Sequence, residues 1–344
     1  MIGKEDSRVI RGTLSSVTEH DLPHERLNAS EIRRRFGGVF HVQDDDIGVY
    51  ELDAGYLVPE NCVRSYIDIA VANGSELRFS EGMTSYSESI DGLITVQTTK
   101  GSYRCRKLVL SVGAWAPEMF GRAIPAMPLH VERRVLFWFE PKEQSIHLFE
   151  DLPVYIWDYG DDVNFYGFPS QAAAGSAEGV KVAMHIQKTF IPGLLLPRNC
   201  HNLTRISTQV AMHIQKTDQS CSPQSIRRAV GEEEVNIMRG LLARHIPLLN
   251  GPLVSTATCM YTLTPDEHFL LDFHPDSQKV LLVSPCSGHI YPNFNPNLGL
   301  TYSFSIFHPK SGVSETAVLR SRVQVLQCDR RDRKRPGHHR RNCF

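Results

Sequence analysis

The sequence predicts a mixed α/β protein built from two portions, one α/β and one largely antiparallel β. The first indication is its size and composition. A chain of 344 residues is long enough for two domains, and 41% hydrophobic with 22% charged residues is ordinary for a globular protein. The second is that helical and strand patterns alternate as far as residue 113. The third is that residues 132–168 become strand-like and rich in aromatic side chains.

Composition also narrows the classes of partner. A formal net charge of -1 argues against general affinity for nucleic acid. No apolar run approaches the roughly 20 residues that span a bilayer, and the N-terminus has no apolar signal region. The eight cysteines contain no CxxC pair, so neither a disulfide framework nor a four-cysteine zinc site is expected. A reducing compartment fits this cysteine usage best.

The first clear helix signal is LNASEIRRRFGG, residues 27–38. Either Asn28 or Ser30 can cap its start, because both side chains can accept a backbone hydrogen bond. Gly37 is expected to end the helix, since glycine adopts the left-handed conformation at low cost.

A second helix is predicted within residues 58–79, beginning near Pro59 and ending at Asn73-Gly74 before a short strand. Two strands are predicted next, at 92–101 and 103–113, separated by a Lys-Gly turn. The second of these runs into a glycine turn, as parallel strands of α/β sheets do where a ligand binds.

An octapeptide, VAMHIQKT, occurs twice, at 182–189 and at 210–217. The two copies begin 28 residues apart. Solenoid repeats of such a period recur at least three times and share only a pattern, whereas here there are two identical copies and no third. We therefore interpret residues 182–217 as containing a 28-residue insertion or duplication.

The stretch TCMYTLTPDEHFLLDFHP, residues 258–275, contains one cysteine, three acidic residues and two histidines. Alternate residues of a strand share a face, so Asp266 and His268 could point together, as could Asp272 and His274. Spacing alone is weak evidence for a metal, however, and we expect none. A cysteine nucleophile at Cys259 paired with His268 is equally unsupported, because a catalytic pair must be adjacent in the fold.

Taken with the following VLLVSPCSGH, this stretch closely resembles the monomeric sarcosine oxidase and N-methyltryptophan oxidase family of flavoproteins. The family pattern is C-M-Y-T-x-T-x-D-E-x-F-x-[IL]-D-x-H-P, followed by F-S-G-H-G-F-K. Other segments agree in the same order, and the resemblance covers about residues 1 to 289: AGYLVPENCVRSY, TTKGSYRCRKLVLSVGAWAP, FYGFPS, GVKVAMH and ARHIPLLNG.

The resemblance implies a two-domain FAD-dependent oxidoreductase fold of the D-amino-acid-oxidase type. A dinucleotide-binding domain is interleaved with a substrate domain whose antiparallel sheet covers the flavin. The expected division is 1–40 substrate domain, 41–120 FAD-binding domain, 121–265 substrate domain, 266–290 FAD-binding domain and 291–344 a divergent, disordered basic tail.

The resemblance implies FAD as the cofactor, bound covalently through a thioether to Cys259. Gly288 and His289 match further cofactor-binding positions. The reaction would oxidise the C–N bond of an N-methyl or cyclic secondary amino acid to an imine, with dioxygen reduced to hydrogen peroxide.

By the same matching, Tyr166, Lys181, His185 and Tyr261 fall at the substrate side of the flavin and are the expected catalytic residues. His213, in the second copy of the octapeptide, competes with His185. We favour His185 because only the first copy keeps the preceding Gly-Val-Lys, although the second keeps the expected continuation TDQSCSP.

The sequence departs from the family pattern in several places. The sequence contains no G-x-G-x-x-G turn, and the residues after Cys286-Ser-Gly-His differ from the expected G-F-K. We therefore expect an N-terminally truncated and C-terminally divergent member. Two hypotheses follow: a flavin amine oxidase, or a non-catalytic remnant that acts at most as an interaction protein.

The expected partners are a small N-methyl or cyclic amino acid and dioxygen, with no nucleic acid and no membrane. The expected state is a monomer, either cytoplasmic or peroxisomal.

Overall fold

The computed structural model describes residues 1–121, 124, 127–159, 163–170, 179–186, 220–264 and 270–284, with three short strands further on. Contacts divide the described chain into two compact units. The first holds Met1–Tyr56, Ser111–Leu271 and the described part of 282–321; the second holds Leu57–Leu110 and Asp272–Leu281. The second unit lies within the segments that the sequence assigns to the FAD-binding domain, 41–120 and 266–290, and those boundaries stay a prediction.

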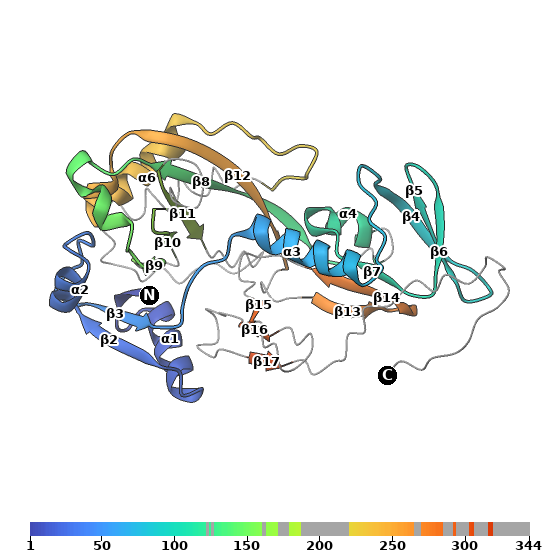
Figure 1. The fold of residues 1–344 in the computed structure, drawn as a ribbon, viewed down its shortest axis with the longest axis horizontal. Helices are drawn as coiled ribbons and strands as arrows, with labels where there is room; N and C mark the ends of the chain where they lie inside the picture. Colours follow the sequence, from blue (N-terminus) through green and yellow to red (C-terminus); the bar gives the residue numbers. More distant parts are fainter. Residues whose placement is uncertain are drawn as a thin grey trace, which may run out of the picture. The chain divides into compact units, whose positions relative to one another are not determined.

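An eight-stranded sheet dominates the first unit, in the order β12-β8-β11-β10-β9-β1-β3-β2 (Figure 1). Neighbouring strands are antiparallel except β1 and β9, which run parallel. The strands are β1 (Ile2–Lys4), β2 (His24–Asn28), β3 (Asp46–Glu51), β8 (His130–Phe139), β9 (Tyr155–Asp158), β10 (Val163–Gly167), β11 (Val180–Ile186) and β12 (Leu253–Leu263). The strand-like, aromatic pattern predicted for 132–168 is thus confirmed.

One face of this sheet is packed into the hydrophobic core. Alternate strand residues such as Phe137, Phe165 and Val182 point into it, because successive side chains leave a strand on opposite faces. Four helical segments cover that face: α2 (Ala29–Arg35), η2 (Glu143–Phe149), α6 (Glu232–His245) and η4 (Pro247–Leu249).

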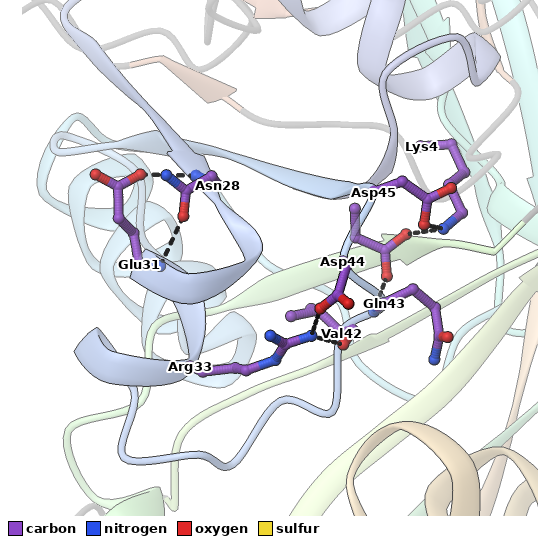
Figure 2. Close-up of polar contacts among 9 residues, drawn as sticks. Lys4, Asn28, Glu31, Arg33, Val42, Gln43, Asp44 and Asp45 are labelled. Atoms are coloured by element: carbon purple, nitrogen blue, oxygen red, sulfur yellow. Dashed lines mark hydrogen bonds and ion pairs between the residues drawn. The ribbon is translucent and has the colours of Figure 1, made fainter.

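A capping box fixes the start of α2, as the sequence predicts for 27–38. The Asn28 side chain accepts a hydrogen bond from the Glu31 N–H at 3.0 Å, and the Asn28 N–H donates to the Glu31 carboxylate at 2.7 Å (Figure 2). The Arg33 guanidinium then donates to the Val42 carbonyl at 2.7 Å and holds the loop after the helix (Figure 2). Gly37 follows with a φ of 59°, in the left-handed region.

Helix α1 (Arg8–Glu19) packs against the opposite face at the β1–β3 end of the sheet. Ser7 caps it by accepting a hydrogen bond from the Ile10 N–H at 3.4 Å. Ile10 meets the backbone at Gly3, where an added Cβ would stand only 3.2 Å from the Ile10 side chain. The short elements η1 (Gly113–Trp115) and α4 (Ala116–Gly121) also belong to the first unit.

In the second unit, helix α3 (Pro59–Ala72) confirms the helix predicted within 58–79, and Gly74 follows it with a φ of 85°. The short strand expected directly after it is not formed there: the next strand is β4 (Met83–Glu88). Strands β5 (Ile94–Thr98) and β6 (Ser102–Cys105) form the predicted hairpin around Lys100-Gly101. The predicted strand 103–113 is divided, because its second half, β7 (Leu108–Leu110), joins another sheet.

That other sheet has the order β13-β14-β7, with β13 (Leu270–His274) and β14 (Ser277–Ser284). Lys279 of β14 donates to the Glu88 carboxylate and to the Gly92 carbonyl, both at 2.7 Å, and so ties β14 to the β4–β5 hairpin. A third small sheet joins β15 (Pro292–Asn293), β16 (Ser303–Ser305) and β17 (Thr316–Val318); the rest of the predicted tail lies outside the described residues. No helix of the described chain is long and apolar enough to cross a membrane.

Candidate active site

Strand register places the expected catalytic residues of β10 and β11 on one face of the large sheet. Val180 and Val182 of β11 point into the core, so Lys181 and His185 point to the other face. Tyr166 of β10 lies opposite Ala183, and directly paired residues share a face. Tyr166 therefore joins Lys181 and His185.

Strand β8 carries the same face across to β12. Ala183 lies opposite Leu136, which in turn lies opposite Ala257 of β12. Two and four residues after Ala257 stand Cys259 and Tyr261, which therefore share that face. Residues from three separate stretches of sequence thus meet on one surface, and all five expected side chains in the described chain are half-buried there.

Two of the expected catalytic side chains are in contact. The rings of His185 and Tyr261 have centroids 5.9 Å apart. The guanidinium carbon of Arg134, on β8, lies 5.2 Å from the centroid of the same Tyr261 ring, within the range of a cation–π interaction. A histidine and an arginine therefore flank one tyrosine.

Lys181 lies in an aromatic setting a few residues away along the sheet. Its ammonium is 4.9 Å from the Phe168 ring centroid and 5.7 Å from that of Trp138. Phe168 also meets Tyr166 edge to face, with centroids 6.0 Å apart. This end of the face therefore places one cation beside several aromatic rings. Such an arrangement could bind a small anion that carries an apolar substituent.

The thiol of Cys259 sits in a partly dehydrated but cationic setting. Burial raises its pKa above the ordinary value, because it disfavours the thiolate, while the charges of Arg134 and Lys181 lower it. Burial also opposes ionisation of Glu132 on the same face. Hydrogen bonds and charges from His130 and Arg134 outweigh that effect, so the pKa of Glu132 lies below its usual value.

A glycine fixes the strand that presents Tyr166. A Cβ added at Gly167 would stand 2.3 Å from the hydroxyl oxygen of Tyr155, which lies opposite it on β9. Only glycine lets the two strands pair at this point without displacing the Tyr155 ring. The glycine of FYGFPS is thus required by packing on the core side of the sheet.

Some sequence-predicted site residues lie outside the described part of the chain: Gly288, His289, His213 and, among the residues considered for a metal, Asp266 and His268. Asp272 and His274 are both on β13, the first exposed and the second buried. The described residues contain no group of three or more histidine, cysteine, aspartate or glutamate side chains that could hold a metal ion.

Sequence reasoning missed Glu132, Arg134, Trp138 and Phe168, which contact each other or the expected residues on this candidate site face. Parity along RRVLFWFE could have shown that Arg134 and Trp138 share a face. The local sequence does not show whether that face is the packed one or the open one, since the preceding residue, Arg133, is also an arginine.

The donor set fits a flavin better than a metal. Cys259 is a free thiol held at the middle of β12, and the cations Arg134 and Lys181 stand on the same face. A ring system that gains negative charge on reduction is suited by fixed cations, and a thiol suits a thioether rather than hard-cation ligation.

Comparison with known proteins supports this assignment. The model of the FAD dependent oxidoreductase family matches residues 4–291. A monomeric sarcosine oxidase of Streptomyces avermitilis is 36% identical over 302 residues, which cover 87% of this chain and 69% of the relative. An N-methyl-L-tryptophan oxidase of Yersinia pestis is 26% identical over 288 residues, covering 84% and 67%. This chain spans between 64% and 69% of the length of the curated relatives it matches.

Solved structures agree on the fold. NikD, described as an unusual amino acid oxidase essential for nikkomycin biosynthesis, superposes with a TM-score of 0.61 at 18% identity, covering 94% of this chain and 74% of that one. Amadoriase I of Aspergillus fumigatus, a fructosyl amine:oxygen oxidoreductase, gives 0.57 at 17% identity, covering 84% and 62%. The fold class expected from the sequence and the family resemblance are both confirmed: the chain belongs to the FAD dependent oxidoreductase family, and monomeric sarcosine oxidases are among its relatives.

Proposed function

We propose that this chain oxidises the C–N bond of N-methyl or cyclic secondary amino acids, with FAD as cofactor and dioxygen as final acceptor. The amine loses a hydride and a proton to become an imine, water hydrolyses the imine, and dioxygen is reduced to hydrogen peroxide. When bound, FAD supplies the two-electron acceptor for that hydride. The activity belongs to the relatives by name, and its transfer to this chain is the proposal.

The observation that carries the proposal is the shared sheet face. Tyr166, Lys181 and His185 reach it from β10 and β11, and Cys259 and Tyr261 reach it from β12. Residues matched to the family one by one from sequence would have no reason to converge on one surface unless the surface acts as a unit.

Each side chain has a proposed role that its surroundings support. Lys181, within cation–π distance of two rings, would attract the substrate carboxylate, and the aromatic rings around it would receive the N-methyl group. His185, beside Tyr261, would accept the proton that the amine must lose before it can give up a hydride. Tyr166 would orient the substrate through its hydroxyl.

Covalent attachment of FAD through Cys259 is part of the same proposal. Cys259 would hold FAD through a thioether; forming that bond would remove one hydrogen from the thiol and one from the cofactor, and dioxygen would take up both as hydrogen peroxide. Cys259 is a free thiol on the site face, half-buried, with two cations close enough to affect its ionisation. Gly288 and His289 remain proposed cofactor contacts on the resemblance alone.

The test is substrate-dependent peroxide formation by the whole chain loaded with FAD. We expect N-methylglycine, N-methyl-L-tryptophan or a cyclic secondary amino acid to give one peroxide per dioxygen consumed, and glycine to give none. Lys181→Met should lower the rate about a hundredfold, whereas Lys279→Met, in the second unit, should leave it unchanged.

Unchanged rates in Lys181→Met would refute the assigned role. A folded, FAD-loaded chain that is inactive toward every secondary amine would refute the enzyme proposal and favour the non-catalytic alternative.

A further inference from the structure

A buried arginine that no sequence pattern assigns stands opposite the expected attachment cysteine. Arg134 of β8 is directly paired with Cys259 of β12, so the two side chains leave the sheet on the same face. The Arg134 side chain is only 6% exposed. A buried guanidinium must be paired or must act on a neighbour, since its desolvation is costly.

A carboxylate and an aromatic ring contact this guanidinium. Its Nη2 donates to the Glu132 carboxylate at 2.6 Å, and its carbon lies 5.2 Å from the Tyr261 ring centroid. Glu132 is in turn bonded to His130 at 3.2 Å. The cation is therefore fixed from both sides, by a carboxylate on its own strand and a ring on the next.

We propose that Arg134 is a positioning residue for Cys259, in that its fixed positive charge favours the thiolate needed for thioether formation. The inference rests on the proposed attachment of FAD at Cys259. Only a thiolate attacks a carbon centre at a useful rate, so a half-buried thiol needs a cation to stabilise that form.

The charges around the thiol are mixed, and their balance decides its reactivity. The titratable and charged groups on the same face are His130, Glu132 and Arg134 of β8, Tyr166 of β10, Lys181 and His185 of β11, and Tyr261 of β12. Burial raises the pKa of the Cys259 thiol, and Arg134 acts against it ahead of Lys181. Removing Arg134 should therefore raise that pKa further, and removing Glu132 should lower it.

The thiol can be followed without any flavin. The tryptic fragment between Arg244 and Lys279 contains Cys259 as its sole cysteine. The whole chain, free of cofactor, is treated with iodoacetamide from pH 6 to 10, and alkylation of this fragment is timed by mass spectrometry. The midpoint of the rate against pH reports the thiol itself.

In Arg134→Gln we expect alkylation about tenfold slower at pH 8, with the midpoint raised by about one pH unit. Arg134→Lys should restore most of the rate, because it keeps the charge. Glu132→Gln should speed alkylation, because it removes the opposing charge while its amide oxygen can still accept the hydrogen bond from Arg134.

Arg35→Gln is the matched control. Arg35 makes the same two kinds of contact from a more exposed position, 2.6 Å from the Glu25 carboxylate and 4.2 Å from the Tyr50 ring centroid, and it lies on α2 away from Cys259. It should leave the alkylation profile unchanged.

An unchanged profile in Arg134→Gln overturns the proposal. So does a shift in the same direction for Arg134→Gln and Glu132→Gln, because that is what a loss of packing would produce. If Arg134→Gln fails to fold, the other two variants still decide. Faster alkylation in Glu132→Gln with a nearly normal rate in Arg134→Lys supports the proposal, and slower alkylation in both overturns it. None of these measurements needs activity, so failure of the proposed oxidase reaction would leave them readable.

Discussion

Two neighbouring arginines on β8 show how the two faces of the large sheet differ. Arg133 points to the packed face, where it donates to Glu234 of α6 at 2.6 Å and to the carbonyls of Arg227 and Ala229 at 2.6 and 3.0 Å. Arg134 points to the other face, toward Glu132 and Tyr261. One arginine joins a helix to the sheet, and the other lies among chemically active groups.

The difference teaches that strand parity decides whether the same side chain is used in packing or faces the candidate site. Each of the three guanidinium nitrogens of Arg133 donates to an acceptor of the protein itself. On the opposite face, Cys259, Lys181 and Tyr166 are half-buried. Substitutions on the two faces should therefore fail in different ways.

The largest expected effect is on cofactor attachment, at Cys259. Cys259→Ala should lose all acid-stable flavin, because the thioether has no other sulfur on this face among the described residues. The measurement is flavin absorbance in the pellet after acid precipitation of the FAD-loaded chain. Cys221→Ala is the control, since Cys221 is also a half-buried free thiol beside β8. Acid-stable flavin that survives Cys259→Ala would contradict the assignment.

The next largest effect is on stability, at Arg133. Arg133→Ala should lower the free energy of unfolding by about 3–5 kcal/mol, because it leaves the Glu234 carboxylate, whose side chain is only 6% exposed, without its main partner. Urea unfolding followed by tryptophan fluorescence measures this. Adding Glu234→Gln should recover part of the loss, since it removes the uncompensated charge. An Arg133→Ala variant as stable as Arg134→Lys would end the distinction between the two faces.

A third effect concerns pH on the packed face. Burial, followed by the charge of Arg244, lowers the pKa of His245 to about 4, and its ring lies against Trp157 with centroids 4.6 Å apart. In the unfolded chain this histidine has the ordinary pKa of about 6.5. The free energy of unfolding should therefore be highest above that pH. It should fall by roughly 3 kcal/mol between there and pH 4.

The check on His245 is the unfolding free energy of the wild type and of His245→Phe across this range. The substitution keeps an aromatic ring against Trp157 and should flatten the profile. Identical slopes for the two proteins would show that the histidine is not buried in its neutral form.

The smallest expected effect is at Tyr155, whose hydroxyl is buried and has no hydrogen-bond partner among the described residues. Tyr155→Phe should change the unfolding free energy by less than about 1 kcal/mol and leave activity intact. Tyr166→Phe, on the site face, should keep stability and lower kcat/KM about tenfold. Thermal melts and peroxide assays on the two variants test this, and an activity loss in Tyr155→Phe alone would reverse the assignment of faces.

Much of the local structure could be predicted from sequence because its causes are local. The helix at 27–38 was predicted from a cap and a glycine, and the capping box of Asn28 with Glu31 confirms it. The helix from Pro59 and the hairpin at Lys100-Gly101 follow for the same reason. The predicted strand 103–113 was wrong in extent, since tertiary pairing divides it at residues 106–107 between two sheets.

By itself, the sequence determined the family, the cofactor class and which residue types match the family motif, because these depend on the order of residues along the chain. Only the tertiary structure decided that Tyr166, Lys181, His185, Cys259 and Tyr261 share a face, since that depends on the register between strands up to about a hundred residues apart. It also decided which of two adjacent arginines enters the site. Local propensity is the same for Arg133 and Arg134, and only the packing of α6 against one side of β8 distinguishes them.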